Sequence, residues 1–136
     1  MSGNQSTQTG LNQRKHFEFQ VEIEDPDTGL ITPFPMEVDT GSPAAIVLPR
    51  FCSQFFNEYQ GPIKMAGAAS GTCPTYNANI LSVDSLSMDF ETMAIMGLDN
   101  SYDYGLLGID FLKRVYTEIE GPPNGKTMNL EDTHLP

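Results

Sequence analysis

An acidic residue stands between two short apolar stretches of this 136-residue chain. Residues 34–38 carry an apolar side chain at every second position, as a strand with one buried face does, and they lead directly into Asp39-Thr40-Gly41-Ser42. Residues 45–48 are apolar again. A carboxylate in such a setting loses hydration, and acids perturbed in this way are frequent at catalytic centres. Asp39 is therefore the first candidate for a catalytic residue; the alternative is an aspartate that stabilises a turn at a strand end.

The tripeptide Asp-Thr-Gly also occurs earlier in the chain, in different surroundings. Residues 24–29 read Glu-Asp-Pro-Asp-Thr-Gly. The acidic and proline neighbours predict a hairpin turn over residues 25–29, in which Gly29 supplies a positive φ. The tripeptide alone is therefore weak evidence, and the apolar setting of the second copy is what indicates function.

A second informative segment lies near the C-terminus. Residues 104–114 read Tyr-Gly-Leu-Leu-Gly-Ile-Asp-Phe-Leu-Lys-Arg, an apolar pair closed by glycine and followed by a short amphipathic stretch of helical type. Together, residues 38–42 and 105–112 resemble the retropepsin-like aspartic proteases, the single-domain enzymes of retroviral and retrotransposon type. The resemblance covers residues 16–120, and Ser42-Pro43 is closer to the retrotransposon-like versions than to the commoner viral form.

The resemblance implies an all-β fold: a single-domain, closed β-barrel of the acid-protease type with a flap hairpin and one short C-terminal helix. It implies that Asp39 is catalytic and that Thr40, Gly41 and Ser42 support the active site. In the family, the threonine hydroxyl reaches across a dimer interface to the backbone of the partner, a role that would fall to Thr40. Asp110 is expected to support the short helix and not to act as a second catalytic acid.

Small side chains are concentrated in residues 62–76, between two strand-like arms. Small residues at a hairpin tip let the backbone approach a ligand and leave the tip mobile. By resemblance this is the flap that closes over a bound peptide, and the alternative is an ordinary flexible loop. The residues assigned to substrate binding at its tip are Ala66, Gly67, Ala68, Ala69, Ser70 and Gly71.

Length favours an enzyme assembled from two copies. A chain of 136 residues can bury the core of one domain but has about half the length of a two-lobed pepsin-like enzyme. One Asp39 per chain cannot easily serve as both acid and base, whereas a twofold homodimer would pair it with its symmetry mate. We expect an aspartic endopeptidase that hydrolyses peptide or protein substrates without a cofactor. The alternatives are a catalytically inactive, retropepsin-like binding or dimerisation module and a small β-barrel ligand carrier.

The charge balance argues against nucleic acid as a partner. The chain has 18 Asp and Glu against 7 Lys and Arg, a formal net charge of -11, so most of its surface repels phosphate backbones.

No apolar run is long enough to span a membrane, and the N-terminus lacks the apolar core of a signal peptide. We expect a soluble, intracellular protein without a membrane partner.

No group of residues has metal-ligand spacing. Cys52 and Cys73 allow one disulfide or two free thiols, and a reducing compartment favours the thiols. His16 and His134 are isolated, so a zinc site is not expected. The loop that begins at Asp99 lacks the closing Glu of a calcium loop.

The remaining pattern divides the chain into three parts. Residues 16–24 alternate strictly and predict a strand whose partner follows over residues 30–38. Residues 1–15 are polar without an apolar period and predict a disordered N-terminal tail, and residues 121–136 predict a flexible C-terminal tail. The protease-like domain is therefore expected over residues 16–120.

Overall fold

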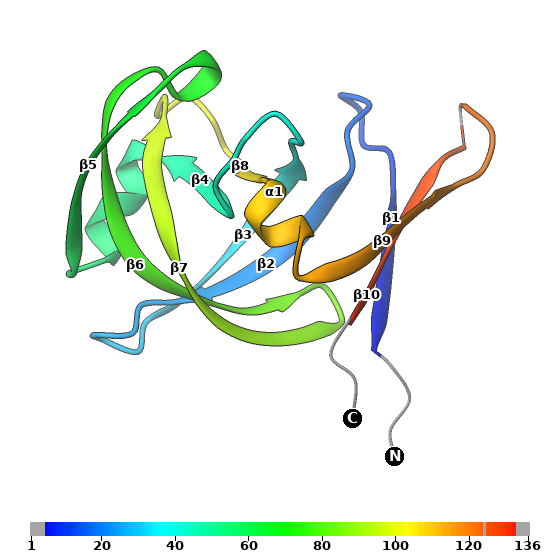
Figure 1. Ribbon diagram of the computed structural model, residues 1–136, viewed down its shortest axis with the longest axis horizontal. Coiled ribbons are helices and arrows are strands. Elements are labelled where there is room, and N and C mark those ends of the chain that lie inside the picture. Colours follow the sequence, from blue (N-terminus) through cyan, green and yellow to red (C-terminus); the bar gives the residue numbers. More distant parts are fainter. Residues whose placement is uncertain (1–4, 124, 133–136) are drawn as a thin grey trace.

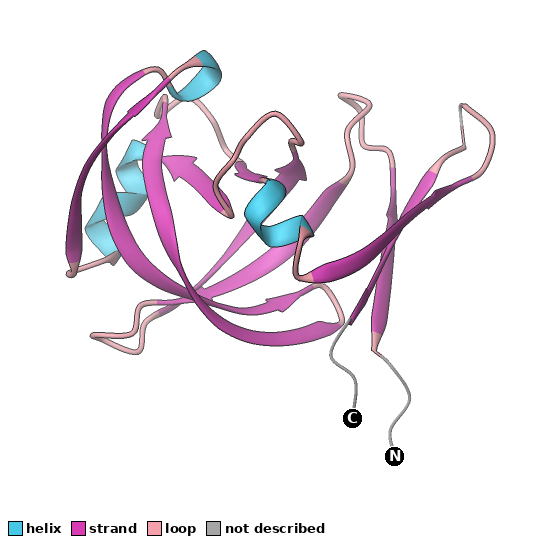
Figure 2. Cartoon of the chain, in the orientation of Figure 1, coloured by secondary structure: helices cyan, strands magenta, loops and turns pink. Residues whose placement is uncertain are grey.

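The computed structural model describes residues 5–123 and 125–132, and the regular secondary structure in these ranges consists mostly of strands (Figures 1 and 2). The strands are β1 (Ser6–Gly10), β2 (Glu18–Glu24), β3 (Ile31–Val38), β4 (Ile46–Pro49), β5 (Tyr59–Met65), β6 (Gly71–Val83), β7 (Leu86–Leu98), β8 (Gly105–Leu107), β9 (Val115–Glu120) and β10 (Thr127–Asp132). The helical segments are α1 (Ile109–Leu112) and two 3-10 turns, η1 (Arg50–Phe55) and η2 (Gly67–Ala69). No helix in the described ranges is long and apolar enough to cross a bilayer.

Six strands close into a barrel. The sheet runs in the order β2-β3-β8-β4-β7-β6-β5, and an additional pairing of β2 with β6 joins its ends, which leaves β5 outside as a partner of β6. Strand β8 is parallel to β3 and antiparallel to β4, so it lies between the two strands that flank Asp39 in sequence. The predicted all-β fold with a closed barrel and one short helix is confirmed.

The strict alternation of residues 16–24 places one face of β2 in the core. Phe19, Val21 and Ile23 are at most 1% exposed, whereas the residues between them face outward. The predicted turn over residues 25–29 is also present: Gly29 has a φ of 75°, and its backbone N–H donates to the carbonyl oxygen of Asp25 at 2.8 Å. The first copy of the tripeptide therefore closes a hairpin, as its sequence setting predicts.

The two ends of the described chain form a second sheet beside the barrel (Figure 1). Its strand order is β1-β10-β9, with both pairings antiparallel. The prediction of unstructured tails is therefore wrong for residues 6–10 and 127–132; residues 1–4, 124 and 133–136 lie outside the described residues. Met128 and Leu130 alternate into the core, and the polar strand β1 needs only its backbone to pair with β10.

Candidate active site

The loop that carries Asp39 is held by the segment that follows β8. The backbone N–H of Asp39 donates to the carbonyl oxygen of Leu107 at 2.8 Å, and that of Ile109 donates to the carbonyl oxygen of Ser42 at 2.9 Å. The N–H of Gly108 donates to the carbonyl oxygen of Ala45 at 3.0 Å. The two segments singled out in the sequence are thus joined through their backbones, at the end of β3 and the start of α1.

Gly108 is at this junction because no side chain fits there. A Cβ atom at this position would lie 2.0 Å from the carbonyl oxygen of Ala44 and 2.5 Å from that of Ser42. Both contacts are to backbone atoms, so a side chain would force the acid-bearing loop away from α1. The glycine therefore permits the close approach that fixes Asp39.

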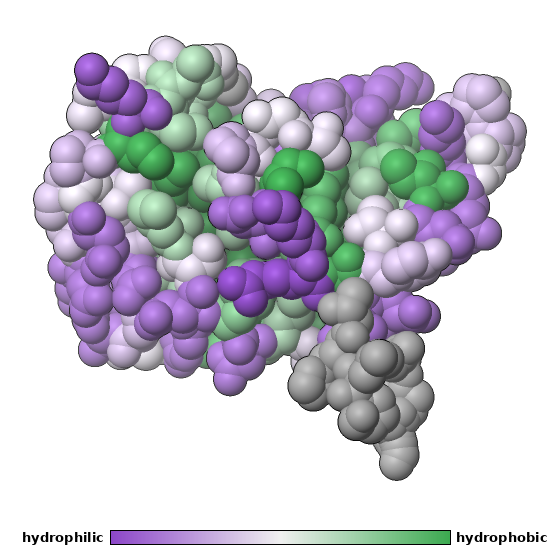
Figure 3. Space-filling view, viewed as in Figure 1, coloured by the Kyte–Doolittle hydropathy of each residue, from purple (hydrophilic) through white to green (hydrophobic). Residues whose placement is uncertain are grey.

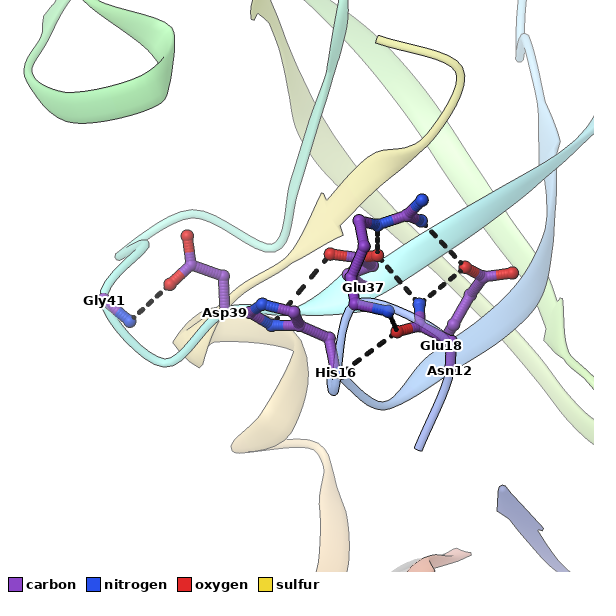
Figure 4. Close-up of polar contacts among 7 residues, drawn as sticks. Asn12, His16, Glu18, Glu37, Asp39 and Gly41 are labelled. Carbon is purple, nitrogen blue, oxygen red and sulfur yellow. Dashed lines mark hydrogen bonds and ion pairs between the residues drawn. The ribbon is translucent and has the colours of Figure 1, made fainter. Parts of the chain in front are cut away.

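The carboxylate of Asp39 is only half-buried in the single chain. Its Oδ1 atom accepts a hydrogen bond of 2.9 Å from the backbone N–H of Gly41 (Figure 4). The setting between apolar strands suggested a more enclosed acid, but Asp39 lies just beyond the last residue of β3, where the barrel opens to its surface. One carboxylate oxygen is held by the loop and the side chain faces a cavity.

Thr40 and Ser42 lie on opposite sides of the same loop. Ser42 is 6% exposed, and its Oγ atom is buried without a hydrogen-bond partner among the described residues. Its backbone N–H donates to the carbonyl oxygen of Asp39 at 3.1 Å, which closes the turn. Thr40 is exposed, and its side chain makes no hydrogen bond within the described ranges.

A cavity of about 160 Å³ separates the Asp39 loop from the segment that was predicted as the flap tip. The residues that line it are Asp39, Gly41, Ser42, Pro43, Val47, Met65, Ala66, Gly67, Ala69 and Leu106. The structure therefore brings three of the four predicted loop residues to one cavity with three predicted tip residues. Thr40, Ser70 and Gly71 are outside this lining, and the side chain of Ala68 lies outside the described part of the structure.

The predicted flap tip adopts a 3-10 turn between β5 and β6. Gly67 begins the turn and Gly71 begins β6 after it, with φ values of 86° and 90°, which other residues rarely adopt. Ala69 is 4% exposed and packs with Cys73 and Val47 in the smaller of the two cores. The predicted tip therefore combines two glycines of positive φ with one buried alanine, beside the cavity that Asp39 faces.

Glu37, a buried acid close to Asp39, was not predicted as a site residue from the sequence. Glu37 is 3% exposed, two residues before Asp39 on β3, and it accepts hydrogen bonds at Oε2 from Arg14 Nε at 2.5 Å and from Asn12 Nδ2 at 2.8 Å. The hydrogen bond between Arg14 and Glu37 is the main reason why the pKa of Arg14 is raised. The alternation of residues 34–38 places Glu37 on the face opposite the core, and the residues that cover it belong to a segment predicted to be disordered. The one sequence signal that could have revealed this group was the presence of a charged residue, Glu37, two positions before Asp39.

Asn12 shapes the turn that covers Glu37. Its Oδ1 atom accepts hydrogen bonds from the backbone N–H groups of Arg14 at 2.9 Å and His16 at 3.0 Å. Its Nδ2 atom donates to both Glu18 and Glu37. A polar segment without apolar periodicity is thus ordered by side-chain hydrogen bonds to its own backbone.

Neither cysteine lines the cavity, although Cys73 packs behind the predicted flap tip. Cys52 and Cys73 are both free and buried, and burial raises the pKa of Cys52 to about 11. Within the described residues, no three His, Cys, Asp or Glu side chains are grouped so that they could hold a metal ion.

Comparison with known proteins reveals a similarity of structure. No protein-family model matches the sequence, and no curated protein matches it either. Among solved structures, the chain is similar to the crystal structure of a retropepsin-like aspartic protease from Rickettsia conorii, with a TM-score of 0.55 and 16% sequence identity over 98% of each chain. At this identity the similarity shows the fold, which is retropepsin-like over nearly the whole chain.

Proposed function

We propose that this protein is an aspartic endopeptidase whose active site forms when two copies of the chain meet. One observation carries the proposal: in a retropepsin-like fold, Asp39 faces a cavity whose opposite wall is the glycine-flanked turn η2. The same cavity places a carboxylate, backbone groups and small apolar side chains together. This combination suits an extended peptide better than it suits a small polar ligand.

The proposal requires a homodimer because each chain supplies one acid. A twofold axis near Asp39 would bring the two carboxylates together. The exposed side chain of Thr40, which makes no hydrogen bond within the described ranges, is available to a partner subunit. The half-burial of Asp39 in the single chain also supports this arrangement, since a second copy would complete its enclosure.

The chemistry follows from electrostatic repulsion between the two acids. Two carboxylates at such short range cannot both be ionised, so the pair holds one proton; paired acids in aspartic proteases are the type case of this behaviour. The ionised Asp39 removes a proton from a water molecule that attacks the peptide carbonyl carbon, and the protonated Asp39 donates to the carbonyl oxygen. The two apparent pKa values belong to the pair and not to one chain. The N–H of Gly41 keeps Oδ1 of each acid oriented.

Substrate would bind as an added strand between the Asp39 loop and the flap. The flap tip, residues 66–71, would cover the peptide by rotation at Gly67 and Gly71. Val47, Met65 and Leu106 would contact apolar side chains next to the scissile bond.

The test compares two substitutions of the same kind in the two copies of the tripeptide. Wild type, Asp39→Asn and Asp27→Asn are incubated with a diverse peptide mixture from mildly acidic to neutral pH, and the products are identified by mass spectrometry. Asp39→Asn should keep the fold and lose at least about a thousandfold in rate, because an amide cannot act as the base. Asp27→Asn should cleave at the wild-type rate, because Asp27 is an exposed residue of a remote turn.

Two results would contradict the proposal. The first is cleavage by purified Asp39→Asn at the wild-type rate. The second is a folded, dimeric wild type that cleaves no peptide and binds no pepstatin-type analogue of the tetrahedral intermediate. The second result would favour the inactive binding module instead.

A further inference from the structure

Five polar residues form a connected group beside Asp39, and we call them the Glu37 cluster (Figure 4). They are Asn12, Arg14, His16, Glu18 and Glu37. Four come from the segment between β1 and β2 or from the start of β2, and Glu37 comes from β3. A buried ion pair is often no more stabilising than apolar residues of similar volume, so stability alone does not explain why Glu37 is charged.

Arg14 is the exposed centre of the cluster, and its side chain is held from three directions. Nε donates to Glu37, Nη2 donates to Glu18 Oε1 at 3.3 Å, and the guanidinium carbon lies 4.1 Å above the centre of the Tyr104 ring. The side chain is nevertheless 47% exposed, and Nη1 has no partner among the described residues. A guanidinium fixed in this way presents its unused donors in one direction, at little further loss of conformational entropy.

The cluster lies outside the cavity that Asp39 faces but is joined to it through β3, because Glu37 stands two residues before Asp39. Glu37 and Asp39 are two residues apart, so their Cα atoms are separated by about 6.6 Å in an extended chain. An extended peptide repeats its side chains on one face at the same spacing. A peptide that crosses Asp39 and extends alongside β3 would therefore bring a neighbouring side chain towards Glu37 and Arg14.

We propose that Arg14 and the Glu37 cluster form a polar subsite that selects a neutral, hydrogen-bond-accepting side chain, Asn or Gln, close to the scissile bond. This inference rests on the proposed function, because it assumes that the peptide binds across Asp39. The amide oxygen would accept from Nη1 of Arg14. An apolar side chain would displace water from the guanidinium without replacing its hydrogen bond, and sites built to hydrogen-bond a ligand discriminate strongly against analogues that cannot.

The charge of the cluster decides between an amide and a carboxylate. With His16 counted as neutral, Glu37 and Glu18 carry two negative charges against the single positive charge of Arg14, and the whole chain has a net charge of -11. A substrate carboxylate would meet this surplus of negative charge, whereas an amide would not. In a twofold dimer the subsite occurs twice, so the preference should appear at one position on each side of the scissile bond.

The first test measures binding without turnover. Fluorescently labelled peptides of otherwise apolar sequence, each with Gln, Leu or Glu at one position in turn, are titrated with Asp39→Asn and followed by anisotropy. We expect the Gln peptide to bind roughly tenfold or more tightly than the Leu or Glu peptide at the selected positions. The same series is then assayed for cleavage by the enzyme with Asp39 intact.

Variants of the cluster test whether Arg14 causes the preference. Arg14→Met alone leaves Glu37 buried and unpaired and risks unfolding, so the main variant combines Arg14→Met with Glu37→Leu. It should lose the preference for Gln while still binding the Leu peptide. Arg14→Lys, which keeps the charge but not the planar fork, should keep part of the preference. Lys126→Met removes an exposed lysine elsewhere and should leave the preference unchanged.

The outcomes separate this inference from the proposed function. Cleavage without a preference for Gln, a preference for Glu over Gln, or a preference that survives in the double variant would overturn the inference and leave the endopeptidase intact. Selective binding by Asp39→Asn without cleavage by wild type would support the subsite and overturn the endopeptidase. Absence of both binding and cleavage would overturn both.

Discussion

At the scale of single residues, context and not identity decides what an aspartate does. Asp27 and Asp39 begin the same tripeptide, yet Asp27 lies in a hairpin turn and Asp39 follows a core strand and faces a cavity. Glycines in the site also have separate roles. Gly108 permits a close backbone approach, whereas Gly67 and Gly71 adopt positive φ at the start of η2 and just after it.

Gly108→Ala should destabilise the protein strongly. The new Cβ would collide with the backbone oxygens of Ala44 and Ser42, and the expected loss is about 3 kcal/mol in the free energy of unfolding, the upper end of the usual range for overpacking. Gly10→Ala is the matched control, because its Cβ would lie 3.9 Å from the nearest atom, the carbonyl oxygen of Lys126. Urea denaturation of both variants measures the difference. Equal stability of the two would refute the packing argument.

Cys52 should make stability fall with rising pH in alkaline solution. Burial raises the pKa of its thiol from 9.0 to about 11, so the unfolded chain loses this proton first and is favoured as pH rises through that window. The free energy of unfolding should fall by at most about 3 kcal/mol, because each pKa unit corresponds to about 1.4 kcal/mol. Denaturation between pH 8 and 11 should show a shallower decline for Cys52→Ala than for wild type. If stability fell equally with pH in Cys52→Ala and in wild type, other groups would be responsible for the decline.

At the scale of elements, the two terminal strands belong to the folded structure. Strand β10 has the alternating pattern of a half-buried strand, with Leu130 at 0% and Met128 at 3% exposure. Strand β1 has no such pattern and is ordered through its pairing with β10. The turn that follows β1 then covers Glu37 through Asn12 and Arg14, so hydrogen bonds link this turn to the strand that leads to Asp39.

Leu130→Ala tests whether the terminal sheet contributes to stability. Removal of a fully buried leucine side chain should lower the free energy of unfolding by about 2–5 kcal/mol. Gln8→Ala, on the exposed face of β1, should change it by no more than about 0.5 kcal/mol. Chemical denaturation compares the two. A Leu130→Ala protein as stable as Gln8→Ala would mean that the C-terminal strand is not packed in solution.

At the scale of the whole molecule, the chain has a retropepsin-like fold, and the proposed function requires two copies of it. Each barrel carries one candidate catalytic acid, Asp39. On the face seen in Figure 3, hydrophilic side chains divide the apolar surface into patches. With a net charge of -11, two copies repel one another at long range, and salt screens this repulsion. The proposed dimer should therefore associate more tightly at moderate than at very low ionic strength.

Specific activity should fall on dilution if the dimer is the active form. Below the dissociation constant, the fraction of chains in dimers decreases with concentration, so activity per chain decreases as well. Initial rates over a wide range of enzyme concentration, together with sedimentation of the same samples, measure both quantities. A specific activity that stays constant after the chains have separated would show that the monomer is competent.

The sequence determined those features that depend on local pattern. Strict alternation placed Phe19, Val21 and Ile23 in the core, the acidic proline-containing segment before Gly29 indicated a turn, and the apolar setting of Asp39 distinguished it from Asp27. Side-chain periodicity and backbone φ preferences act over a few residues, so they can be recognised without knowing the rest of the chain.

Tertiary structure decided what depends on partners distant in sequence. Strand β1 is ordered by β10, and the burial of Glu37 depends on Asn12 and Arg14, 25 and 23 residues away along the chain. A polar segment has no periodic signal of its own when its hydrogen bonds are made to a remote strand. The catalytic candidate could therefore be found by pattern, whereas the charged residues beside it became visible only once the chain had folded.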